Sequence, residues 1–146
     1  MNFLDSLAIS SSGLSAQRLR MNLISSNLAN VNTTRTETGE PYKRKDLVFE
    51  AAQPDAFKSL LDAELNDDGR GVKVAAIIED NKPFIEKYDP GHPDADENGY
   101  IRLPNVNVVE EMVNMISASR SFEANATAVR ATKDMAAMAL DIGRTS

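Results

Sequence analysis

Apolar side chains recur at every seventh position near both ends of this sequence of 146 residues. One column consists of Leu7, Leu14, Met21 and Leu28, and the other consists of Val108, Met115, Phe122, Val129 and Ala136. A seven-residue repeat keeps apolar side chains on one side of a helix and favours helices that wind around one another. Both ends of the chain are therefore predicted to be helices that pack against other helices.

The first predicted helix covers residues 3–31. Residues 10–13, with the sequence SSSG, weaken it, because serine competes for backbone hydrogen bonds and glycine adds entropy to the unfolded chain. We expect a bend or local disorder there. The polar run that includes Asn27, Asn30 and Asn32 predicts the end of the helix. For Asn27 and Asn30, both capping and hydrogen bonds between helices remain open.

The second predicted helix covers residues 106–143, with Glu110 and Glu111 near its start and Gly143 as its C-terminal cap. Its roughly 37 residues would reach about 55 Å, whereas a compact chain of this length is about 40 Å across. Residues 135–142 are apolar around nearly the whole helix, which favours burial on every side. We therefore expect this helix to contact neighbouring subunits.

A companion column on the second helix mixes apolar and polar residues. Its members are Met112, Ser119, Ala126, Lys133 and Leu140. Polar residues in such columns cost stability and specify register and neighbour. We assign the same role to Ser119 and Lys133.

The middle of the chain is acidic and rich in turns. Residues 36–104 carry nine basic and sixteen acidic side chains, and all six prolines lie between residues 35 and 105. Residues 56–65 are modestly helical. Residues 72–78 alternate as in a strand, and Pro83 predicts a turn into a second extended run that ends at Tyr88. A β-hairpin is the expected product.

These patterns divide the chain into residues 1–33, 34–105 and 106–146. The expected fold is mainly α with a small β module, and the two long terminal helices pair as a coiled coil. The longest apolar run, residues 74–78, is far shorter than a membrane span. The N-terminus lacks the basic region and cleavage site of a secretory signal. Acidic charge argues against nucleic-acid binding, and the absence of cysteine excludes disulfides.

Several short motifs suggest chemistry, but each lacks a required part. Residues 94–99 resemble the start of a calcium-binding EF-hand loop, yet the twelfth position is Asn105 where a glutamate is needed. His92 is the only histidine and has no cysteine partner for a zinc site or a nucleophile pair. Residues 92–94, HPD, lack the helical hairpin of a cochaperone, and residues 69–71, GRG, read as a turn. We expect no enzyme, metal or cofactor, with a calcium-binding module as the alternative.

Longer segments resemble a known family. Residues 88–100, YDPGHPDADENGY, and residues 104–113, PNVNVVEEMV, resemble the signature of bacterial flagellar proximal rod proteins. Residues 13–18 and 26–33 are similar to a segment shared by rod, hook and filament-type axial proteins, and residues 39–45 also fit the rod type. The resemblance spans nearly the whole chain and is weakest in residues 50–71 and 135–139.

The resemblance implies a structural subunit of the flagellar basal-body rod. Such a subunit is exported unfolded by the flagellar type III apparatus without signal cleavage. It assembles helically with itself and other axial proteins into a hollow shaft across the periplasm, which transmits torque and passes later subunits. The two terminal helices pair in an inner tube domain. A coiled-coil type III secreted adaptor or needle-like protein is the alternative, against which the loop of residues 89–100 argues.

The assembly interface is assigned to the helix columns and to the two asparagines. Its residues are Leu7, Leu14, Met21, Asn27, Leu28, Asn30, Val108, Met112, Met115, Phe122, Val129, Ala136 and Leu140. No catalytic residue, nucleic-acid partner or membrane insertion is expected.

Overall fold

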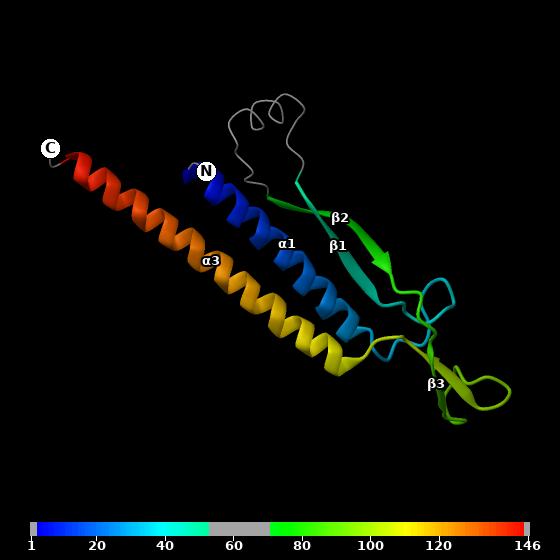
Figure 1. Cartoon of the computed structure of the whole chain (residues 1–146). Coiled ribbons are helices and arrows are strands. Elements are labelled where there is room, and N and C mark those ends of the chain that lie inside the picture. The colour runs from blue at the N-terminus through cyan, green and yellow to red at the C-terminus, as the bar shows by residue number, and fades with distance from the viewer. Residues whose placement is uncertain (1–2, 53–70, 145–146) are drawn as a thin grey trace. The chain divides into compact units, whose positions relative to one another are not determined.

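Within the described part of the chain, one long helix precedes four short strands and another follows them. The computed structural model describes residues 3–52 and 71–144. The elements are α1 (Phe3–Ala29), β1 (Lys45–Ala51), β2 (Val72–Glu79), β3 (Ile85–Tyr88), β4 (Tyr100–Leu103) and α3 (Val108–Arg144) (Figure 1). The predicted class, mainly α with a small β component, is confirmed. The expected helix at residues 56–65 and the first two residues of the expected turn at 69–71 lie outside the described residues.

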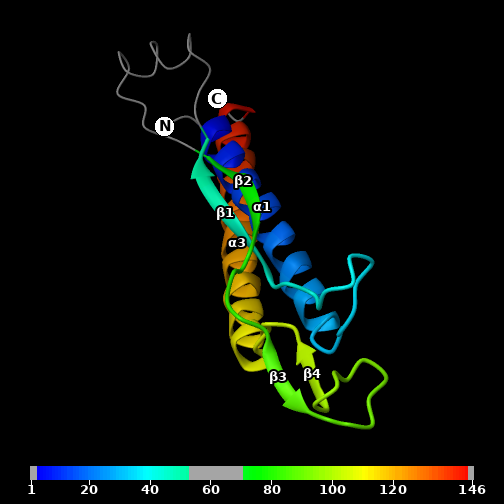
Figure 2. The same ribbon diagram turned by 90° about the vertical axis from the view of Figure 1, so that its right-hand side faces the viewer.

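The strands form two separate pairs, so the hairpin predicted for residues 72–88 is wrong. β2 pairs with β1, and β3 pairs antiparallel with β4 (Figure 2). Between β2 and β3, the Asn105 side chain donates hydrogen bonds to the carbonyl oxygens of Asp80 and Lys82, at 2.9 and 3.1 Å. Pro83 has no N–H for a strand ladder. The connection is thus held open by a side chain instead of closing as a tight turn.

The chain divides into two compact units, and both helices run through both of them. The first unit consists of Met1–Leu19, Phe49–Ala75 and Ala118–Ser146. The second unit consists of Arg20–Val48 and Ala76–Ser117. Each unit therefore contains a part of α1, a part of α3 and one end of the β1–β2 pair.

In the first unit, α1 and α3 approach closely at a glycine. A Cβ atom on Gly13 would lie 3.1 Å from Nδ2 of Asn125, so only glycine leaves room for that side chain without a shift. Ala16 and Ala118 are buried in this unit. Small residues at these positions let helix backbones lie near each other, and the contact is made without large apolar side chains.

The local disorder expected at residues 10–13 is absent, because α1 continues without interruption from Phe3 to Ala29. Ser12 explains the difference. Its hydroxyl donates to the Ile9 carbonyl oxygen at 2.7 Å and accepts the backbone N–H of Val72 at 3.0 Å. The serine therefore bonds back within α1 and also to the start of β2.

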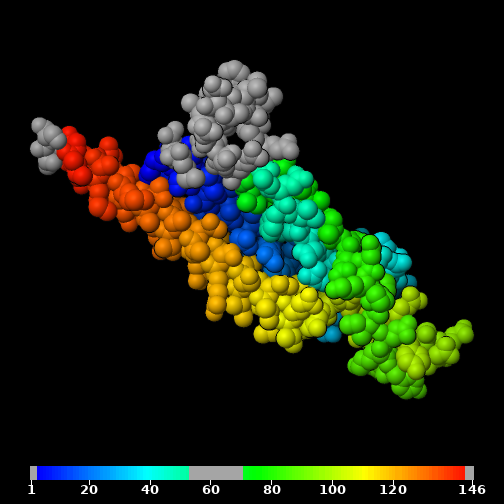
Figure 3. All heavy atoms as spheres, viewed as in Figure 1, coloured from blue at the N-terminus to red at the C-terminus, as the bar shows by residue number. Residues whose placement is uncertain are grey.

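The C-terminal turns of α3 keep large apolar side chains at the surface of the single chain. Met135, Met138 and Ile142 are exposed, and Leu140 is 71% exposed. The orange and red turns in Figure 3 form this part of the surface. Gly143 lies inside α3, which ends at Arg144, so the predicted C-terminal cap at Gly143 is wrong.

In the second unit, the helix ends carry local caps. Asn107 precedes α3, and its side-chain oxygen accepts the backbone N–H of Val109 at 3.0 Å, as an N-cap does. After α1 ends at Ala29, the Asn30 side chain donates to the Ser26 carbonyl oxygen at 2.9 Å. The predicted end of the first helix is confirmed to within two residues.

The loop between β3 and β4 is an acidic turn that closes on Gly99. The Asp96 carboxylate accepts the backbone N–H groups of Asn98 and Tyr100, at 2.9 and 2.8 Å. Gly99 has φ of +81°, and its N–H donates to the Asp96 carbonyl oxygen. At the base of the loop, the Tyr88 and Tyr100 rings meet edge to face with centroids 5.3 Å apart.

Replacing Gly99 with alanine should lower the free energy of unfolding by about 1–2 kcal/mol, since an L residue is strained at positive φ. The new Cβ would also lie 3.0 Å from the Tyr88 ring. Urea denaturation followed by circular dichroism measures the change. Gly91→Ala is the control, because its Cβ would have only one neighbour, at 3.9 Å. Equal losses in both variants would contradict the prediction.

Candidate functional site

The second unit contains a buried cluster of polar side chains that are joined by hydrogen bonds. Its centre consists of Asn27 from α1, Arg44 from the segment before β1, and Glu111 from the first turns of α3. Glu111 is 0% exposed and Asn27 is 1% exposed. Buried amide and carboxylate groups are stable only when their hydrogen bonds are made, so the partners of each group decide what the cluster does.

Asn27 uses both ends of its side-chain amide. Its nitrogen donates to Glu111 Oε2 at 3.0 Å and to the Lys45 carbonyl oxygen at 2.8 Å. Its oxygen accepts the Lys45 N–H at 3.0 Å and the Tyr42 hydroxyl at 2.9 Å. One side chain thus joins α1 to α3 and pairs with the backbone of β1 as another strand would. Of the two roles left open for Asn27, the interhelical hydrogen bond is confirmed.

Arg44 provides the positive charge that the buried Glu111 carboxylate requires. Arg44 Nε donates to Glu111 Oε1 at 2.8 Å, and Arg44 Nη1 donates to Asp46 Oδ2 at 2.9 Å. The Arg44 side chain is itself only 13% exposed. A pair of this kind gains little net stability over apolar packing, but removing one partner leaves a charge uncompensated in a poorly solvated place.

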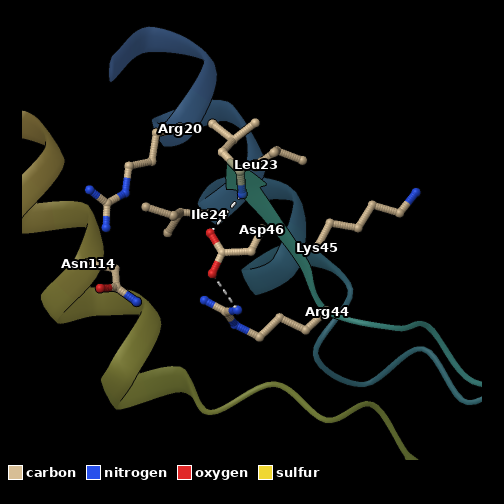
Figure 4. Close-up of a pocket in the computed structure, with 8 residues that line it drawn as sticks. Arg20, Leu23, Ile24, Arg44, Lys45, Asp46 and Asn114 are labelled. Atoms are coloured by element: carbon tan, nitrogen blue, oxygen red, sulfur yellow. Dashed lines mark hydrogen bonds and ion pairs between the residues drawn. The ribbon is translucent and has the colours of Figure 1, made fainter. Parts of the chain in front are cut away.

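The surroundings of Arg44 and Asp46 favour the charged form of both side chains. Burial opposes the charge on Arg44, but hydrogen bonds to Asp46 and Glu111 outweigh it and raise the pKa of Arg44 above its usual value. Burial likewise opposes the charge on Asp46, but the hydrogen bonds from Arg44 and the Leu47 N–H outweigh it, and the Asp46 pKa is lowered. In Figure 4 the Asp46 carboxylate points toward the Arg44 guanidinium.

A small cavity adjoins the cluster. Its volume of about 10 Å³ is close to the space of one water molecule. Its lining includes Arg20 and Ile24 of α1 and Asn114 of α3 (Figure 4). The space is too small for an organic ligand, so it belongs to the packing of the cluster.

Asn105 extends the hydrogen-bond network to the β2–β3 connection. Its side-chain oxygen accepts the backbone N–H of Arg44 at 2.8 Å, while its nitrogen holds two carbonyl groups of that connection. The Asp80 N–H in turn donates to the Arg44 carbonyl oxygen at 2.8 Å. Arg44 is therefore fixed through its backbone as well as its side chain.

The predicted apolar columns flank the contact between helices and do not form its centre. On α3, the buried or closely packed residues are Glu111, Ala118, Asn125 and Thr132, spaced by seven. Half-buried positions beside the contact are Leu7, Leu14, Met21, Leu28, Met115, Phe122, Val129 and Ala136. Val108, Met112 and Leu140 are exposed. Asn30 bonds only near the end of α1, to Ser26 and Thr33.

Sequence reasoning missed three members of the cluster. Arg44 lies within a run of three basic residues, 43–45, which favours a position in solvent, yet its side chain is largely buried. Glu111 was predicted only as an acidic residue near the start of the second helix, and Tyr42 received no individual role. One signal was present in the sequence: from Glu111 to Thr132, every seventh residue is small or polar.

Residues 92–94 and 94–99, the motifs that resemble a cochaperone and the start of an EF-hand loop, lie in the loop between β3 and β4 and are used for local structure. His92 Nδ1 accepts the Asp94 N–H at 3.1 Å, and Asp94 Oδ2 accepts the Thr34 hydroxyl at 2.8 Å. Residues 3–52 and 71–144 contain no group of three or more His, Cys, Asp or Glu side chains placed to hold a metal ion. Within the same ranges, no helix has the length and hydropathy that a membrane crossing requires.

Replacing Glu111 with alanine should lower the free energy of unfolding by about 3 kcal/mol, because Arg44 and Asn27 lose a buried partner. Glu110→Ala is the matched control, since Glu110 lies on the same turn but is exposed, and its loss should be below about 1 kcal/mol. Urea denaturation of both variants makes the comparison. A loss in the Glu111 variant no larger than in the control would show that the cluster does not stabilise the fold.

Asp46 should make stability depend on pH in the acid range. Because its pKa in the folded chain lies below the usual 3.8, the carboxylate stabilises the fold above that pH. This contribution is lost as the pH falls through the folded value. The urea midpoint of Asp46→Asn should therefore lie below that of the unmodified chain at pH 7, and the gap should narrow below about pH 3.8. A gap that is the same at both pH values would contradict this linkage.

Comparison with known proteins identifies relatives along the whole chain. The family model described as flagella basal body rod protein matches residues 7–35, and the model described as flagellar basal body rod FlgEFG protein C-terminal matches residues 97–142. The first match lies mainly on α1. The second covers β4 and nearly all of α3, together with the preceding end of the loop.

Individual relatives carry one name. The flagellar basal-body rod protein FlgC of Borreliella burgdorferi is 46% identical over 97% of this chain and 98% of its own length. FlgC of Bacillus subtilis is 46% identical, and FlgC of Salmonella typhimurium is 41% identical, each over 99% of this chain and all of the relative. Identity at this level over the full length of both sequences places the chain in the family of FlgC flagellar basal-body rod proteins.

Proposed function

We propose that this protein is a structural subunit of the proximal rod of the bacterial flagellar basal body. It assembles helically with itself and with other rod proteins into a hollow shaft that transmits torque and lets exported subunits pass. The full-length similarity to FlgC proteins supports the rod assignment. The two family models also fall on the terminal regions that carry α1 and α3.

The observation that carries the assembly proposal is the exposed apolar surface of α3. In the second unit, Val109, Val113 and Ile116 are exposed, and Met112 is 53% exposed. In the first unit, Leu140 is 71% exposed beside other large apolar residues. Clustered apolar side chains at a surface mark contact sites for other proteins. Met112 and Leu140 belong to the predicted interface, and we propose that neighbouring subunits cover them.

We propose that the terminal helices form the inner tube domain. Within each unit α1 and α3 lie against each other, and the contact follows a seven-residue spacing. This supports a coiled-coil pairing of residues 1–33 with residues 106–146, with residues 34–105 as the segment outside it. The half-buried apolar columns on both sides of the contact would then be shared between the chain's own helices and its neighbours.

The rod assignment also implies how the subunit reaches its place. We propose export by the flagellar type III apparatus, without a cleaved signal peptide, to the rod in the periplasmic space. An adaptor or needle-like protein secreted by a type III system is the weaker alternative. The loop of residues 89–99, tied to the rest of its unit by the Thr34–Asp94 hydrogen bond, and the full-length FlgC similarity both favour the rod.

The role we propose is mechanical and not enzymatic. The largely buried charged groups of Arg44 and Glu111 form an ion pair with each other, and Asn27 links this pair to backbone groups. They hold elements together and do not face a cavity large enough for a substrate.

Replacing Met112 or Leu140 with aspartate should abolish swimming without unfolding the chain, because both side chains are exposed in the monomer but buried in the proposed rod. Swimming is scored in bacteria whose own copy of the protein has been deleted. Circular dichroism of the purified variants checks the fold. Isolated basal bodies should lack a complete rod.

Thr127→Asp is the matched control for these variants. Thr127 is exposed on α3 and lies seven residues from both Arg120 and Asp134, in a polar column. A cell with this variant should swim normally. Normal swimming with Met112→Asp and Leu140→Asp would overturn the proposed interface, and so would immobility of the control.

A further inference from the structure

The apolar columns of the two helices leave their axial register undetermined. Because apolar residues recur every seven positions on both helices, sliding α3 by seven residues past α1 again places apolar side chains opposite apolar side chains. Such a slide moves the helix by about 10.5 Å. Seven residues further along α3 from Ala118, Asn125 and Thr132, the positions are again small or polar, so sterics alone permit the slide.

Contacts within each unit define the register that the chain adopts. In the second unit, the Asn27 amide donates a hydrogen bond to the Glu111 carboxylate. Ile24, three residues before Asn27, and Asn114, three residues after Glu111, line one cavity. This is an antiparallel pairing. In the first unit, Gly13 lies beside Asn125. Gly13 is fourteen positions before Asn27, and Asn125 is fourteen positions after Glu111. Both units therefore have the same register.

Glu111 and Asn27 distinguish this register from a shifted one. After a slide of seven residues, Asn27 would face Ala118, a methyl group that offers no hydrogen bond. Glu111 would face residue 34, which lies beyond the end of α1 at Ala29. The Asn27 amide would then lose its bond to the carboxylate, and the pair of Arg44 with Glu111 would lose its enclosure by α1.

We propose that the buried Asn27–Arg44–Glu111 cluster selects the axial register of α1 against α3. The apolar columns supply adhesion both in the observed register and in the one shifted by seven residues that is described above, and the cluster forms only in the observed one. Glu111, Asn27 and Arg44 are thus positioning residues. An uncompensated buried charge makes the shifted state rarer by more than about a hundred-fold. This inference concerns one chain and does not rest on the proposed assembly.

The test replaces Asn27 and Glu111, the two members of the cluster on the helices, with leucine and reads the register directly. The chain has no cysteine, so two introduced cysteines give an unambiguous signal. Ile24→Cys with Asn114→Cys reports the observed register. Ile24→Cys with Ser121→Cys reports the register shifted by seven residues. A thiol cross-linker shorter than the slide joins each pair, and mass spectrometry of the linked peptides gives the yield.

Each cysteine pair is built in three backgrounds. These are the unmodified chain, Asn27→Leu with Glu111→Leu, and the control Asn22→Leu with Glu110→Leu. The control makes the same chemical changes at exposed positions of the same two helices. Circular dichroism compares the helix content of all proteins under the cross-linking conditions.

The unmodified chain and the control should yield only the 24–114 product. The variant with Asn27→Leu and Glu111→Leu should keep its helices and give both products in comparable yield. This is a rise of more than about a hundred-fold for the 24–121 product. The proposal is overturned if this variant still gives only the 24–114 product. It is also overturned if this variant alone loses its helical signal, because the apolar columns would then be insufficient to pair the helices.

Discussion

The contact between the Glu111 carboxylate and the Arg44 guanidinium is the interaction on which the second unit depends. A carboxylate with no exposed surface is tolerated only if a positive charge and hydrogen-bond donors surround it, and the chain supplies these from two other segments. The requirement fixes the end of α1, the entry to β1 and the start of α3 around one point. Asn105 then attaches the β2–β3 connection to the same point.

The centre of the helix contact is small and polar, and this arrangement frees apolar residues for other uses. Gly13 and Ala118 let the helices approach, and Asn27 with Glu111 replaces apolar packing by directed hydrogen bonds. The large side chains of α3 are therefore half-buried at the edges of the contact or exposed. A soluble monomer with a conventional apolar seam would keep them inside. For a chain that belongs to the rod family, exposed apolar residues are an expected property of a part that works in an assembly.

Periodicity predicted the two long helices and their ends well, because the spacing of apolar residues within a short stretch of sequence is enough to indicate a helix. It could not tell which of several seven-residue columns lies at the centre, since adjacent columns on one face share the same period. The strand pairing was predicted wrongly for a related reason. Alternation predicts a strand at residues 72–78, but it does not identify the strand that pairs with it. The hydrogen bonds of Ser12 at the start of β2 and of Asn105 just after its end help to determine that partner. Arg44 was missed because its burial depends on Glu111, which lies 67 residues away.

The separation between Asn27 and Glu111 has a consequence for folding kinetics. Their hydrogen bond closes a loop of 84 residues, more than half of the chain. Helix α1 forms from neighbouring residues within about a microsecond, but the cluster requires a contact of high sequence separation, which pays loop-closure entropy before any stabilisation is gained. The N-terminal helix therefore precedes the cluster, and a chain that emerges N-terminus first remains open until residue 111 has arrived. Completion of the second unit is governed by the last quarter of the sequence.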